Sequence, residues 1–150
     1  MSILKRIDED VIKALKARNE FLTTLLRGLK SDIKYKQIEI GKELTDDEII
    51  GVLSSAAKKR RDSIEQFKAG NRQDLVDKET SELNFITEYL PEQLSEDKIR
   101  EIVVKVINNI GAESPSQIGM VMKEVMPQLK GKADGKIVKG LVTAILSGGN

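Results

Sequence analysis

Residues 45–70 read TDDEIIGVLSSAAKKRRDSIEQFKAG, and this stretch sets the fold class that the rest of the chain follows. Thr45 followed by Glu48 matches a capping box, and acidic residues in a first helical turn suit the positive end of the helix dipole. The pattern predicts one helix of about 24 residues, roughly 36 Å long, ending near Gly70. Its apolar residues, which recur at helical spacing, are Ile49, Leu53, Ala56, Ala57, Ile64 and Phe67.

Helical spacing also recurs on both sides of this stretch. Two helices are predicted before it, the first capped by Ser2 and the second beginning after Asn19, and one is predicted after it, capped by Asn71 and ending before Pro91. Their apolar stripes are Leu4, Ile7, Val11 and Leu15; then Leu22, Leu25, Leu26, Leu29 and Ile33; then Leu75, Val76, Leu83, Ile86 and Leu90. No window alternates strictly enough to indicate a half-buried strand. The fold class is therefore predicted to be all-α, with an antiparallel helical bundle at residues 1–92.

A second unit is predicted to begin after the segment Pro91-Glu92-Gln93-Leu94. Ser95 can restart a helix, Ser114-Pro115-Ser116-Gln117 combines a cap with Pro at the first helical position, and Asp134 can cap the last helix. Three helices of roughly 15 residues with tight Gly-containing turns indicate a compact module at residues 93–150. The stripes that should form its core are Ile99, Ile102, Val103, Val106 and Ile110; Ile118, Val121, Met122, Val125 and Leu129; and Ile137, Val138, Leu141, Val142 and Ile145.

The composition excludes several function classes. The 150 residues include 25 Lys and Arg against 24 Asp and Glu, but no Cys, His or Trp. Thiolate nucleophiles, imidazole bases and Cys/His zinc sites are therefore ruled out, and we predict no catalytic residue, no metal site and no cofactor. Five aromatic residues are too few for a base-stacking platform. Residues 1–6 lead straight into charged helical sequence, and no stretch approaches 18 apolar residues. We therefore expect no membrane partner and a cytoplasmic protein or its organellar equivalent.

The densest basic run is Lys58-Lys59-Arg60-Arg61. It could contact a nucleic-acid backbone as a secondary basic face. It could also be a solvated, salt-bridged face, because Asp62 lies four residues after Lys58 and Glu65 lies four after Arg61. We favour the solvated face here.

A second basic cluster surrounds the turn before the last predicted helix. Residues 118–150 hold five lysines against two acidic residues, a local charge of +3 in a chain of net charge +1. Two glycines in this turn would let a partner approach the backbone closely, although an Asp134 cap would occupy the helix end that could otherwise bind phosphate. The alternative is an ordinary helix corner that its lysines keep soluble. The candidate RNA-binding residues are Lys123, Lys130, Gly131, Lys132, Gly135, Lys136 and Lys139.

Several strings in the chain resemble a known family. IGMVM at 118–122, Met126-Pro127 and KGKADGK at 130–136 resemble the GatB/YqeY tail motif, which also occurs at the C-terminal end of the B subunit of glutamyl/aspartyl-tRNA amidotransferase. The strings at 59–67 and 70–76, with YLPEQL at 89–94, resemble stand-alone YqeY-like proteins. The resemblance implies an all-α fold and a tail that contacts the body of tRNA. Lys139 stands where the family often has Asn or Ser.

The resemblance also shapes the expected function. The chain has the tail but lacks the amidotransferase cradle, so the resemblance implies only a family association with carbon–nitrogen ligase activity that uses glutamine as amido-N-donor. We expect a non-catalytic tRNA-binding accessory protein linked to tRNA-dependent amidation or tRNA metabolism, which reads shape and phosphates. The alternatives are a protein–protein adaptor for an aminoacyl-tRNA synthetase or amidotransferase, and an auxiliary subunit of such a ligase.

Overall fold

The computed structural model describes residues 2–148, which form seven α-helices, one 3-10 turn and no strand. The predicted all-α fold is confirmed. The helices divide into two compact units, residues 1–90 and 91–150. No helix in the described part of the chain is long and apolar enough to span a membrane.

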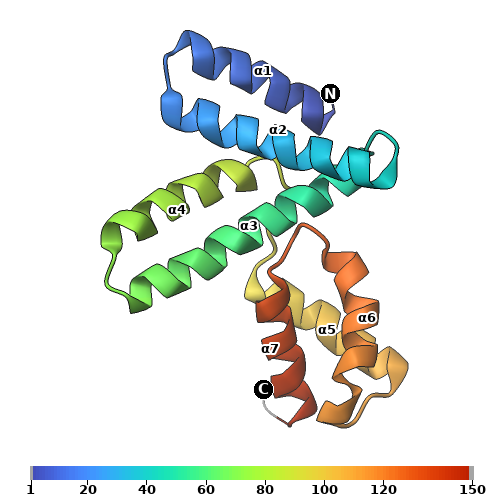
Figure 1. Cartoon of the computed structure of the whole chain (residues 1–150). Helices are drawn as coiled ribbons and strands as arrows, with labels where there is room; N and C mark the ends of the chain where they lie inside the picture. Colours follow the sequence, from blue (N-terminus) through green and yellow to red (C-terminus); the bar gives the residue numbers. More distant parts are fainter. Residues whose placement is uncertain (1, 149–150) are drawn as a thin grey trace. The chain divides into compact units, whose positions relative to one another are not determined.

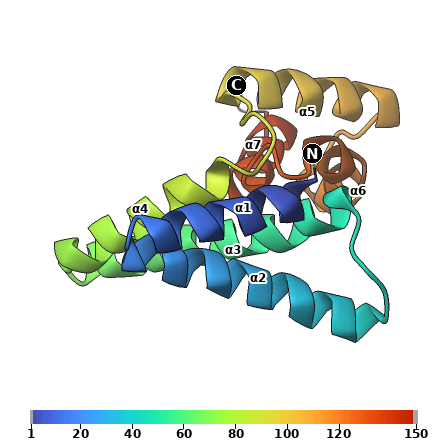
Figure 2. The ribbon, with the colours of Figure 1, turned by 90° about the horizontal axis from the view of Figure 1, so that it is seen from above.

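The first unit consists of two helical hairpins. Helices α1 (Ile3–Lys16) and α2 (Glu20–Ile40) lie side by side, as do α3 (Asp46–Ala69) and α4 (Gln73–Thr87) (Figures 1 and 2). The predicted long helix is confirmed as α3, and the Thr45 hydroxyl accepts a hydrogen bond from the Glu48 backbone N–H at 3.3 Å. The core between the hairpins is apolar, with fully buried side chains at Ile7, Leu26, Leu29, Ile33, Ile49, Leu53 and Ile86.

A polar cluster joins the two ends of this unit. The Tyr89 hydroxyl, just after α4, donates a hydrogen bond to the Asp10 carboxylate on α1. Arg6 lies over the Tyr89 ring, 5.2 Å from its centroid, and donates to the Glu88 carbonyl at 3.3 Å. Burial, together with the Asp10 carboxylate, raises the pKa of Tyr89 well above its ordinary range. These contacts fix the end of α4, where the chain leaves the unit, to the first helix.

The second unit contains α5 (Glu96–Ile110), the 3-10 turn η1 (Pro115–Gln117), α6 (Ile118–Leu129) and α7 (Gly135–Leu146), seen in Figure 1. The Gln117 side chain accepts from the Ser114 backbone N–H at 3.1 Å, as a capping box requires, but the first turn is 3-10 and α6 begins only at Ile118. The fully buried core residues of this unit are Val103, Val121, Val125, Leu129, Val138 and Val142.

Three local predictions were wrong. Asn71 does not cap α4, because its φ of 56° places it in the left-handed region and the N-cap position falls to Arg72, which has no capping side chain. Leu15 is 47% exposed because the buried stripe of α1 continues through Ala14 instead. Ile137 is 50% exposed, since the buried face of α7 begins at Val138.

Candidate functional site

The turn between α6 and α7 carries the candidate site. Helix α6 ends at the buried Leu129, whose carbonyl accepts from the Lys132 backbone N–H at 2.8 Å. The Asp134 side chain caps α7 by accepting from the Lys136 backbone N–H at 3.1 Å, which confirms the predicted cap. We call Lys130, Lys132 and Lys136, the three lysines of this turn, the basic corner.

The lysines proposed from the sequence are all exposed. Lys123 lies seven residues before Lys130, two helical turns, so both lie on the same side of α6. Lys136 and Lys139 are three residues apart on one face of α7. Within residues 2–148, no ion pair to an acidic side chain engages Lys123, Lys130, Lys132 or Lys139. Their charge is therefore available to an external anion.

The two glycines of the site differ in their surroundings. Gly131 is buried, has a φ of 75°, and its carbonyl accepts from the Gln93 side-chain amide at 2.6 Å. The expectation that Gly131 presents bare backbone to a partner is therefore corrected: its role is to shape the turn, because few other residues adopt this conformation without strain. Gly135 is half-buried, and a Cβ there would lie 3.8 Å from the Met126 methyl carbon, an ordinary contact.

The other basic run does not form a continuous face. On α3, Lys58 and Lys59 are exposed, but Arg61 is half-buried. The Arg60 guanidinium pairs with the Glu82 carboxylate of α4 at 3.2 Å, and these side chains are only 21% and 13% exposed. Arg60 is thus engaged inside the first unit, so the possible secondary face of four cations is corrected to Lys58 and Lys59. The pairing was missed because its members lie 22 residues apart on different helices.

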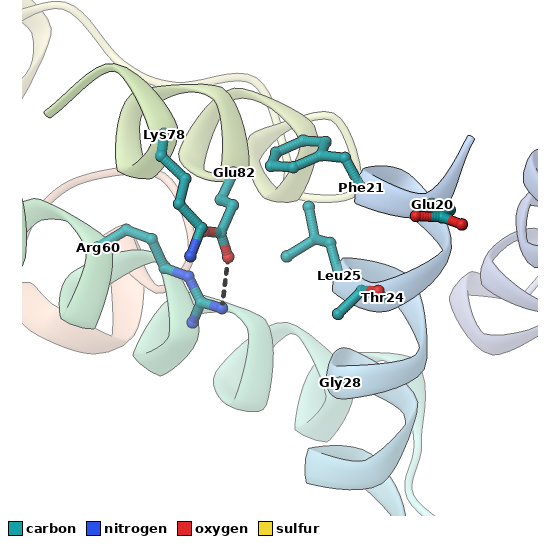
Figure 3. A pocket seen from close by; sticks show the side chains of 8 residues that line it. All are labelled: Glu20, Phe21, Thr24, Leu25, Gly28, Arg60, Lys78 and Glu82. Atoms are coloured by element: carbon teal, nitrogen blue, oxygen red, sulfur yellow. Dashed lines mark hydrogen bonds and ion pairs between the residues drawn. The ribbon is translucent and has the colours of Figure 1, made fainter. Parts of the chain in front are cut away.

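A hollow of about 360 Å³ lies beside this ion pair, between α2, α3 and α4. Figure 3 shows Phe21, Leu25 and Gly28 on the α2 side, facing the Arg60–Glu82 pair. A Cβ on Gly28 would have no neighbour within 4 Å, so a methyl group there would meet only open space. The other lining residues are Glu20, Thr24 and Lys78, so the lining holds two cations, Arg60 and Lys78, and two carboxylates, Glu20 and Glu82. The hollow therefore has no net charge with which to select an anion, unlike the basic corner.

Among the described residues, no group of three or more acidic side chains is placed so that it could hold a metal ion. Several acidic side chains serve as helix caps or hydrogen-bond partners. Asp46, for example, accepts a hydrogen bond from the Ile3 backbone N–H at 3.2 Å and so ties α3 to the start of α1.

Comparison with known proteins gives matches over almost the whole chain. The family described as Yqey-like protein matches residues 4–146. The protein named "Altered inheritance of mitochondria protein 41, mitochondrial" from Lachancea thermotolerans is 35% identical over 85% of this chain and 68% of its own length. The protein of the same name from Kluyveromyces lactis is 30% identical over 92% of this chain and 72% of its length. The protein of the same name from Clavispora lusitaniae is 29% identical over 96% of this chain and 87% of its own length.

The predicted cytoplasmic location is contradicted by these matches. All three relatives carry the word mitochondrial in their names. The prediction relied on the polar helical sequence at the start of the chain and on the lack of a long apolar stretch, and neither feature distinguishes one aqueous compartment from another.

Proposed function

The chain belongs to the YqeY-like protein family, and from this premise we propose that it is a non-catalytic tRNA-binding accessory protein. The family membership predicted from the sequence motifs is confirmed by the match over residues 4–146. The resemblance of the KGKADGK segment to the tail of an amidotransferase B subunit adds the expectation of contact with tRNA. Within the proposal, the chain acts in tRNA-dependent amidation or tRNA metabolism without carrying out the chemistry itself.

The observation that carries the proposal is a set of exposed lysines around a well-defined turn. Buried apolar residues hold α6 and α7 beneath the turn, and Lys130 and Lys132 have no ion pair with any acidic side chain in residues 2–148. Lysine is a compact point charge suited to phosphate oxygens, and each such contact releases counterions from the nucleic acid. Exposed cations on a turn that is held in place can contact the phosphates of an RNA backbone.

Recognition in this proposal depends on shape and phosphate rather than on base identity. All five aromatic residues of the chain lie before position 90, so the second unit has none on which an RNA base could stack. About four lysine–phosphate contacts imply that affinity falls on the order of a hundredfold over a fourfold rise in salt.

The first test replaces the basic corner. The triple variant Lys130→Ala, Lys132→Ala, Lys136→Ala should bind tRNA at least about tenfold more weakly, because it loses three phosphate contacts. The control variant Lys58→Ala, Lys59→Ala, Lys68→Ala removes the same charge from exposed positions on α3 and should change affinity less than about twofold. Filter binding or fluorescence anisotropy at two salt concentrations measures both, with circular dichroism confirming the helical content.

Equal losses in the two variants would point to a nonspecific effect of charge and remove the site. Unchanged binding by the corner variant would remove it as well. Capture of a synthetase or amidotransferase that survives nuclease treatment and the lysine substitutions would instead favour the adaptor alternative.

A further inference from the structure

The second unit begins with residues 91–94, which we call the linker and which lie directly against the basic corner. The Gln93 side-chain nitrogen is 2.6 Å from the Gly131 carbonyl oxygen and 2.9 Å from the Pro91 carbonyl oxygen. The Leu94 backbone N–H donates to the Lys132 carbonyl at 2.9 Å. Leu94 also packs against the core of this unit. Two motifs that lie 38 residues apart, YLPEQL and KGKADGK, are therefore joined by hydrogen bonds.

These bonds act on one particular lysine. The Gly131 carbonyl belongs to the peptide group before the Lys132 Cα, and the Lys132 carbonyl belongs to the peptide group after it. Each of the two peptide groups is held by one bond from the linker, through Gln93 and Leu94 respectively. The orientation of these planes sets φ and ψ of Lys132. The two linker bonds, together with the bond from the Lys132 N–H to the Leu129 carbonyl, therefore set the direction in which the Lys132 side chain leaves the backbone.

The other two lysines of the corner are fixed by different means. Lys130 follows directly on α6, whose last residue, Leu129, is fully buried. Lys136 lies in the first turn of α7, where its backbone N–H is bound by the Asp134 cap. Lys132 lies between the two helices, where the Gly131 φ of 75° and the linker bonds define the backbone.

We propose that Gln93 is a positioning residue for tRNA binding, which holds the Lys132 backbone through the Gly131 carbonyl. The inference rests on the proposed function of the basic corner. It adds that a residue without charge, outside the lysine cluster, controls the phosphate contact made by Lys132. In this arrangement a change in the linker alters RNA affinity even though all lysines remain.

The test uses the full chain with Gln93→Met, which keeps the length of the side chain but removes both N–H donors. The matched control is Gln128→Met, since Gln128 is an exposed glutamine of the same unit whose amide donates to the Glu124 carbonyl at 3.3 Å. Loss of one net hydrogen bond at the site should weaken tRNA binding about three- to tenfold in Gln93→Met, and the control should differ from the unaltered chain by less than about twofold.

Two further readouts separate positioning from a general loss of stability. The dependence of log affinity on log salt should be shallower in Gln93→Met by up to about one phosphate contact, and this slope does not change when only the folded fraction falls. In a double-mutant cycle with Lys132→Ala, the second substitution should add almost nothing, because both remove the same contact. Additive losses, or an unchanged slope, would overturn the positioning role.

The possible failures are distinguishable. If the unaltered chain binds tRNA through the corner lysines but Gln93→Met binds equally well, this inference fails and the proposed function stands. If the triple lysine variant binds like the unaltered chain, the proposed function fails and the positioning role falls with it. Hydrogen exchange at the Leu94 amide gives a direct check on the linker, because Gln93→Met should accelerate it several-fold and Gln128→Met should not.

Discussion

The basic run on α3 and the basic corner between α6 and α7 look alike in the sequence but differ in the fold. Each places at least three cations within seven residues. On α3 the neighbouring helix supplies Glu82, which draws Arg60 into the first unit, and Arg61 is half-buried. At the corner the chain turns away between helices, and Lys130 and Lys132 stay exposed without such a partner in residues 2–148. The density of charge along the chain therefore does not show which cations are free to bind a partner. Whether a cation stays exposed depends on which side chains the neighbouring element places against it.

Removing the α4 partner of Arg60 tests whether the two clusters differ in this way. Glu82→Ala leaves the Arg60 guanidinium largely buried and unpaired, so the free energy of unfolding should fall by about 2 kcal/mol, less than for a fully buried pair because both side chains keep some contact with water. Urea denaturation measures the loss, and Glu9→Ala, at an exposed position on α1, should change it by less than about 0.5 kcal/mol.

A loss for Glu82→Ala as small as that of the control would mean that Arg60 is adequately solvated in the native state. The α3 run would then be as available to an anion as the corner, and the contrast between the two clusters would disappear. Replacing both residues with apolar ones, as in Arg60→Met with Glu82→Leu, should recover most of the free energy of unfolding lost in Glu82→Ala, because the cost of that substitution lies in the unpaired Arg60 charge.

The second prediction distorts the corner while leaving all its lysines in place. Gly131→Ala should lower the free energy of unfolding by about 1.5 kcal/mol, because φ is 75° at this position and an L side chain is strained there. The matched control is Gly140→Ala, on the exposed face of α7, where a Cβ would meet nothing within 4 Å and where helix propensity favours alanine. In thermal unfolding, the midpoint temperature should fall for Gly131→Ala and rise for Gly140→Ala.

Local features of the fold could be predicted from the sequence. The cap of α3 at Thr45 and that of α7 at Asp134 depend on residues two or three positions away, and both were predicted. The exposed lysines of the corner were also predicted, because a turn between two apolar stripes places its polar residues outside the core. The exact residue that is buried within a helical turn was predicted less well: the buried stripe of α1 passes through Ala14 rather than Leu15, one residue from the predicted position.

Pairings between distant residues could not be predicted in this way. Tyr89 binds Asp10 across 79 residues, Gln93 binds Gly131 across 38, and Arg60 binds Glu82 across 22. Each requires knowledge of which helices pack together and at what register, and periodicity gives only which face of a helix is buried. The role of Gly131 was misjudged for this reason, since the partner of its carbonyl lies in the linker.

The acidic residue at the corner, Asp134, can affect both stability and anion binding. Asp134 caps α7 by accepting from the Lys136 backbone N–H at 3.1 Å, so Asp134→Ala should lower the free energy of unfolding by about 1 kcal/mol. The same substitution removes a negative charge beside the lysines and uncovers backbone N–H groups at the helix start, where phosphate binds well. Affinity for tRNA should therefore rise about two- to threefold even though the protein is less stable.

Asp134→Asn separates the two contributions, because asparagine caps as well as aspartate but carries no charge. If the carboxylate charge is what opposes phosphate, the Asn variant should keep its stability and gain the same affinity as Asp134→Ala. If the uncovered N–H groups are what matters, only Asp134→Ala should gain, because the Asn side chain still occupies them. A loss of tRNA affinity in both variants would mean that the capped helix end positions Lys136, and the corner would then resemble α3, where an acidic residue holds the neighbouring cation in place.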